Sequence, residues 1–174
     1  MAKHVFLTGE IGIGKSTALN KFLREYGADY DGIVTAYDRR EGDRVLSMYR
    51  ADSRIAREEW ENVPCARVIG DDLEIYAEVF DGFGTEVLLN SGKRELILMD
   101  ELGTMEERAP LFKAAVLRLL DGDVPVYGVV KLRNAPFLDA VRAHAQVEVI
   151  TVTADNRDEV PKLLRERFAL NATR

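Results

Sequence analysis

The chain has 174 residues, a formal net charge of −6 and a single cysteine, Cys65. This length predicts one domain, residues 1–174, with a substantial core. The negative charge argues against nucleic-acid binding as the main function. The lone cysteine excludes an intrachain disulfide. The sequence contains no run of 18 apolar residues, so we expect no membrane-spanning helix. The first residues lack a signal-peptide layout, so we expect a cytoplasmic protein, with a monomer as the default oligomeric state.

Apolar runs that alternate with amphipathic stretches give the expected order of elements. Strands are predicted at residues 4–8, 31–37, 44–49, 73–80, 96–99, 124–130 and 147–152, and helices at 17–26, 85–90, 111–120, 136–143 and 158–168. The second and third strands form a hairpin around a turn at residues 39–43. This alternation predicts an α/β fold, with a mostly parallel central sheet, helices on both faces and one antiparallel hairpin.

Two stretches between these elements have weaker patterns. Residues 51–72 have poor periodicity, and we expect an irregular excursion or lid with a short helix near residues 53–61; a plain surface loop is the alternative. Thr104 and Glu107 have capping-box spacing, and Pro110 stands where the next helix begins.

Residues 9–17 carry the pattern G-x-x-x-x-G-K-[ST] between a predicted strand and a predicted helix. Loop N–H groups and the helix dipole would surround an anion there. Lys15 is expected to neutralise the β- and γ-phosphates and to assist catalysis, and the Ser16 hydroxyl is expected to hold Mg²⁺. The predicted nucleotide-binding residues of the loop are Gly9, Glu10, Ile11, Gly12, Ile13, Gly14, Lys15, Ser16 and Thr17.

The apolar run at residues 96–99 continues into Asp100 and Glu101. Ligands of parallel sheets bind beyond the carboxyl ends of the strands, so both acids should lie on the same edge as the phosphate loop. Asp100 is predicted to hold Mg²⁺, and Glu101 to orient or deprotonate an attacking water. The long interval between Lys15 and Asp100 suggests an additional strand between their two strands, as in P-loop enzymes that use a catalytic Glu.

Further polar and charged residues are expected near this edge. Asn156 and Arg157 follow the last strand, and Lys131 ends a strand and could sense the γ-phosphate. Candidates for a transition-state arginine are Arg39, Arg40, Arg44, Arg133 and Arg157, with a solvated surface charge as the alternative for each.

Two other functional classes remain open. A small kinase would use residues 51–72 as a lid over an acceptor, and a nucleotide-dependent binding module would turn over slowly. Residues 100–103 also fit the D-x-x-G pattern of a switch GTPase, but no guanine-specificity N-K-x-D follows, because Arg157 stands after Asn156.

Four blocks of the chain resemble the small P-loop nucleoside-triphosphatases described from thermophiles, also called cancer-related nucleoside-triphosphatases: residues 4–17, 31–35, 100–106 and 152–158. The resemblance implies Mg²⁺-dependent hydrolysis of ATP, GTP and other nucleoside triphosphates to diphosphate and phosphate, with loose base selectivity. It also implies a phosphate and metal role for residues 15–17, a metal and water role for Asp100 and Glu101, and a nucleoside contact at Asn156 and Arg157. Departures from the family pattern stand at Glu10, Ala36, Leu46, Ser47 and Thr104.

Overall fold

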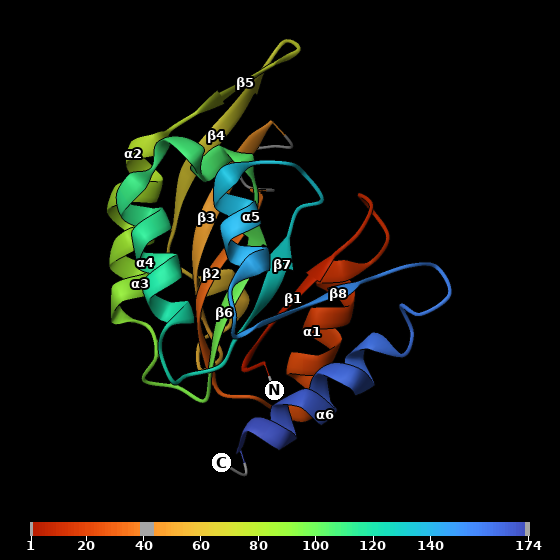
Figure 1. The fold of residues 1–174 in the computed structure, drawn as a ribbon. Helices are drawn as coiled ribbons and strands as arrows, with labels where there is room; N and C mark the ends of the chain where they lie inside the picture. The colour runs from red at the N-terminus through yellow and green to blue at the C-terminus, as the bar shows by residue number, and fades with distance from the viewer. Residues whose placement is uncertain (1, 39–43, 173–174) are drawn as a thin grey trace.

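The computed structural model describes residues 2–38 and 44–172. Within them one eight-stranded sheet has the order β5-β4-β3-β2-β6-β7-β1-β8 (Figure 1). The strands are β1 (His4–Thr8), β2 (Tyr30–Tyr37), β3 (Val45–Asp52), β4 (Asn62–Ile69), β5 (Asp72–Ile75), β6 (Leu96–Leu102), β7 (Val126–Val130) and β8 (Val147–Thr151). Neighbours from β2 through β6, β7 and β1 to β8 are parallel, whereas β2 to β5 pair antiparallel. The predicted α/β class and mostly parallel sheet are confirmed.

The strand order also confirms the additional strand. β7 pairs in parallel with β1 on one side and with β6 on the other. One strand therefore separates the strand that leads into the glycine loop from the strand that carries the two acids, and a ligand can bind near their carboxyl ends.

Helices cover both faces of the sheet (Figure 1). The helices α1 (Lys15–Tyr26) and α6 (Val160–Ala172) lie on one face; α2 (Ala77–Val79), the π-turn η2 (Phe80–Gly84), α3 (Thr85–Asn90), α4 (Pro110–Leu120) and α5 (Pro136–Ala143) lie on the other. Along β6, Leu96 and Leu98 pack toward α1, while Ile97 and Met99 pack toward α4. This two-sided burial explains why the strand reads as a continuous apolar run. Among the described residues, no helix is long and apolar enough to span a membrane.

The expectation of an irregular excursion at residues 51–72 is wrong. β4 occupies residues 62–69 and pairs with both β3 and β5, and the expected helix is reduced to the 3₁₀ turn η1 (Arg57–Glu59). The strand was hidden because Pro64 interrupts its pattern. The β3–β4 register shifts between Leu46 and Ser47, opposite residues 64–66, and proline is tolerated in a sheet at such a bulge.

Two neighbouring predictions concern residues 73–80 and 39–43. The strand predicted at residues 73–80 ends at Ile75, and the chain then turns into α2 and η2. The turn predicted at residues 39–43, with Arg39 and Arg40, lies outside the described residues.

Candidate functional site

The glycine loop closes around Lys15. Gly9, Gly12 and Gly14 have φ angles of 139°, 77° and 108°, which a residue with a side chain rarely adopts. α1 begins at Lys15, two residues earlier than predicted, because the left-handed Gly14 serves as its N-cap. The buried Lys15 Nζ donates to the carbonyl oxygens of Gly9, at 2.9 Å, and Glu10, at 2.7 Å. The ammonium group is thus held inside the loop.

Glu10, the unusual acid of this loop, contributes its backbone to that arrangement. Its carbonyl accepts the Lys15 bond, and its side chain is exposed. Water therefore screens the carboxylate, which lessens its repulsion of an anion in the loop. Ile11, at the tip of the loop, is 91% exposed.

Ser16 and Asp100 meet across the edge of the sheet. The Ser16 Oγ donates to Asp100 Oδ1 at 3.0 Å, which joins the first turn of α1 to the end of β6. Burial raises the pKa of Asp100 to about 6, and the Ser16 bond opposes this rise. A buried carboxylate beside a hydroxyl is a suitable pair of hard oxygen ligands for Mg²⁺, which usually binds through one or two carboxylates plus substrate phosphates. Within the described ranges, no cluster of three or more His, Cys, Asp or Glu side chains could hold a metal by itself.

Glu101 follows on the same strand and is paired. Its Oε1 lies 3.0 Å from Lys131 Nζ, just after β7, and each side chain is about one-third exposed, at 29% and 35%. Sequence reasoning placed both residues on this edge, but it did not predict the ion pair. The pair depends on the adjacency of β6 and β7, which only the strand order reveals.

A buried acid that sequence reasoning missed lies next to this pair. Glu106, in the 3₁₀ helix η3 (Thr104–Arg108), is 1% exposed, and its Oε2 accepts the N–H of Gly103 at 3.0 Å. The predicted capping box at Thr104 and Glu107 is therefore displaced by one residue. Glu107 instead accepts the N–H of Phe137, at the start of α5. Burial raises the pKa of Glu106 to about 8.

Asn156 and Arg157 lie in the loop between β8 and α6, as predicted, but they differ in what their side chains can do. Asn156 Oδ1 accepts the N–H of Thr153 at 2.8 Å, and its Nδ2 donates to the Thr151 carbonyl at 2.9 Å. Its amide thus shapes the loop. Arg157 is exposed and lines a cavity of about 370 Å³ beside the glycine loop, together with Gly12, Ile13, Gly14, Thr17, Ala18, Lys21, Asp158 and Pro161.

The arginines proposed for the transition state lie in different places. Arg44 donates to the carbonyl oxygens of Val68 and Gly70, so its guanidinium is directed to the β4–β5 turn. Arg133 is exposed in the segment after β7. Of the described candidates, Arg157 is the one that lines the cavity at the loop.

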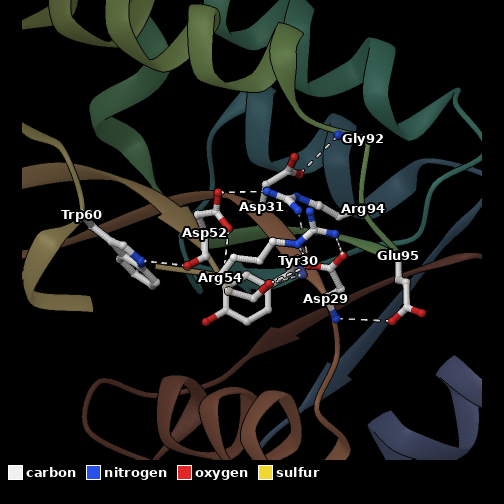
Figure 2. A network of polar contacts seen from close by, with 10 residues as sticks. Asp29, Tyr30, Asp31, Asp52, Arg54, Trp60, Gly92, Arg94 and Glu95 are labelled. Carbon is white, nitrogen blue, oxygen red and sulfur yellow. Dashed lines mark hydrogen bonds and ion pairs between the residues drawn. The ribbon is translucent and has the colours of Figure 1, made fainter. Parts of the chain in front are cut away.

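A second cavity, of about 380 Å³, lies at the opposite, amino-terminal edge of the parallel strands. Its charged lining is largely neutralised: Arg94 bonds Asp52 at 3.0 Å and lies 3.7 Å from Asp29, which also pairs with Arg54 (Figure 2). This network joins the starts of β2 and β6 to the end of β3. Its volume matches that of the cavity at the loop, but its Arg54 and Arg94 are already paired with carboxylates, whereas the cavity at the carboxyl edge adjoins the glycine loop.

A loop that turns its backbone toward an anion, encloses a lysine and faces an acidic strand end across one intervening strand defines a P-loop nucleoside-triphosphate-binding protein. The sheet order, the Lys15–Gly9 bond inside the loop and the Ser16–Asp100 bond place this chain in that class.

Comparisons with known proteins define the family. A family model described as NTPase matches residues 4–164. The chain is 32% identical to the nucleoside-triphosphatase THEP1 of Thermofilum pendens, over 97% of this chain and 96% of that protein, and 30% identical to the cancer-related nucleoside-triphosphatase of Homo sapiens, over 92% and 93%. The chain therefore belongs to the family of THEP1 and the cancer-related nucleoside-triphosphatases, and the predicted resemblance is confirmed.

Solved structures agree with the fold. The solution structure of a human cancer-related nucleoside triphosphatase superposes with a TM-score of 0.73 at 25% identity, covering 99% of this chain and 100% of that one. The crystal structure of THEP1 from Aquifex aeolicus gives a TM-score of 0.74 at 21% identity, over 92% and 96%, which supports the fold alone.

Proposed function

We propose that this protein hydrolyses nucleoside triphosphates to diphosphate and phosphate in a Mg²⁺-dependent reaction. The observation that carries the proposal is the meeting of three groups at one sheet edge: Lys15 inside the loop, the Ser16–Asp100 pair, and Glu101 one residue further along β6. These are the groups needed to bind the phosphates, to hold a metal ion and to direct water.

Each group has a distinct task in this reaction. Lys15 exchanges the carbonyl oxygens of Gly9 and Glu10 for the β- and γ-phosphate oxygens. Ser16 and Asp100 would hold Mg²⁺, which when bound would supply positive charge to neutralise the phosphates. Glu101 orients a water molecule toward the γ-phosphorus and accepts its proton.

The nucleoside occupies the 370 Å³ cavity beside the loop. Arg157 and Lys21 line this cavity, and both have long side chains that can adapt to different bases. Asn156 acts indirectly by holding the loop through Thr151 and Thr153. We therefore expect loose base selectivity, and slow turnover because none of the described arginine contacts directs a guanidinium at the γ-phosphate position.

The proposal is tested by phosphate release from ATP, GTP, CTP and UTP, with and without Mg²⁺ and without any acceptor. Glu101→Gln should lower kcat by about 10²- to 10⁴-fold, the usual contribution of a general base, and leave Mg²⁺–nucleotide binding intact. Lys15→Ala should weaken binding itself. Glu166→Gln, an exposed acid on α6, is the matched control and should behave like the wild type.

One result would contradict hydrolysis, and another would contradict the role of Glu101. Release that stays negligible until a phosphate acceptor is added would favour a kinase. A Glu101→Gln variant with unchanged turnover would remove Glu101 from the mechanism.

A further inference from the structure

Lys131 forms an ion pair with Glu101, the group proposed to direct water. It follows β7, and its backbone N–H donates to the Leu102 carbonyl at 2.9 Å, which continues the pairing of β6 and β7 beyond the strands. This bond brings the lysine alongside the end of β6, and its Nζ lies 3.0 Å from Glu101 Oε1.

The lysine side chain is held along its length. A Cβ atom at Gly103 would lie 3.0 Å from Lys131 Cδ and 3.6 Å from Nζ, so the stem crosses Gly103 at a distance that a larger residue would disturb. At the base of the side chain, the Arg142 guanidinium from α5 donates to the backbone carbonyl oxygens of Lys131 and Arg133, which holds the main chain there. The flexible Lys131 side chain is therefore ordered before any ligand binds, which reduces the conformational entropy lost during the reaction.

The charges around the ammonium direct it to Glu101. Two carboxyl groups face it, Glu101 and the buried Glu106, and the charge of Lys131 lowers the pKa of Glu106 against the larger effect of burial. Glu106 already accepts the N–H of Gly103, whereas the Glu101 carboxylate pairs with the Lys131 ammonium. An ion pair with a partly buried lysine restricts rotation of the Glu101 side chain.

We propose that Lys131 is a positioning residue for hydrolysis, which fixes the carboxylate of Glu101 at the end of β6 in the orientation that directs water. The inference rests on the proposed function, because it assigns Lys131 a task in the same reaction. Lys131 acts through Glu101 and needs no contact with the nucleotide.

The test is Lys131→Met, which keeps the apolar stem and removes the charge. We expect kcat to fall roughly 10- to 100-fold, as small misplacements of a reacting group do, with KM and the binding of a non-hydrolysable triphosphate close to wild type. Lys113→Met is the control. It removes an ion pair of similar exposure, with Glu107, from α4, and should leave turnover unchanged.

A double-mutant cycle then tests whether the effect passes through Glu101. In the Glu101→Gln background, Lys131→Met should cause no further loss, because the group it positions is already absent. An equal additional loss would overturn the inference, as would a raised KM with unchanged kcat, which would mean a nucleotide contact. Wild-type protein that releases no phosphate refutes the proposed function, whereas an active wild type matched by Lys131→Met refutes only the role of Lys131.

Discussion

Replacing Glu106 with glutamine should stabilise this protein at neutral and alkaline pH. The side chain is 1% exposed, and burial raises its pKa from 4.5 to about 8, against the opposing effects of its bonds to Gly103 and of Lys131. In the unfolded chain the group ionises near pH 4.5, so folding at higher pH takes up a proton or buries a charge. Stability due to Glu106 is therefore complete below pH 4.5 and is lost as pH rises to about 8.

The size of the effect follows from the shift. One pKa unit corresponds to about 1.4 kcal/mol, so burial of this acid costs about 5 kcal/mol at pH 8. Glutamine is never charged and keeps an oxygen for the Gly103 N–H, but its amide loses a second acceptor contact, at about 1–2 kcal/mol. Glu106→Gln should then be about 3 kcal/mol more stable than wild type at pH 8. Near pH 5 the charge costs less than about 1 kcal/mol, so the variant should be slightly less stable there.

Urea unfolding of both proteins at pH 5, 6, 7 and 8 measures this difference. Asp100 and His4 also titrate in this range, but their contributions cancel when the variant is subtracted from the wild type at each pH. Glu78→Gln, an exposed acid, should give a difference near zero throughout. A difference for Glu106→Gln that does not change with pH, or a variant less stable at pH 8, would refute the assignment of a buried, high-pKa carboxyl.

Two further predictions concern the core. Gly32→Ala should destabilise the folded protein by about 3 kcal/mol or more, because the new Cβ would lie 2.0 Å from the Leu98 carbonyl oxygen at a φ of 142°. Gly82→Ala is the control: its Cβ would meet open space, so it should lose little stability in the same denaturation assay. Equal losses of stability in the two variants would contradict the steric argument. The His4 ring accepts the Val126 N–H at Nδ1 and bonds the Leu120 carbonyl through Nε2, and burial lowers its pKa to about 4. NMR should find the His4 ring neutral at pH 5. The stability that His4 contributes should be complete above about pH 6.5 and should be lost as pH falls to 4. A His4 ring that titrates near pH 6.5 would exclude this effect of burial.

Sequence patterns predicted the parts of the fold that are locally encoded. The loop at residues 9–17 and the run at 96–101 are recognisable because the loop needs glycines at fixed positions and because a strand buried on both faces is apolar throughout. β4 could not be predicted, since Pro64 and Arg67 interrupt its alternation and its pairing with β3 is decided by a distant segment.

The same division applies to the site. The edge occupied by Lys15, Asp100 and Glu101 followed from strand ends, but the contacts between side chains did not. The Glu101–Lys131 pair required knowledge that β6 and β7 are neighbours, and the burial of Glu106 depends on how η3 packs. The nucleoside contact at Asn156 was predicted from the match to the family, but the bonds of its amide to residues 151 and 153 could not be read from the sequence.

The place of β1 between β7 and β8 affects when the site can form during synthesis. β1 is made first, yet it pairs only with β7 and β8, which come from the last third of the chain. While the ribosome is still producing the middle of the protein, the glycine loop follows a strand without partners, and long-range parallel pairing of this kind is slow. Nucleotide affinity therefore reports on completion of the whole chain, and a nascent protein cut before β8 should not retain triphosphate.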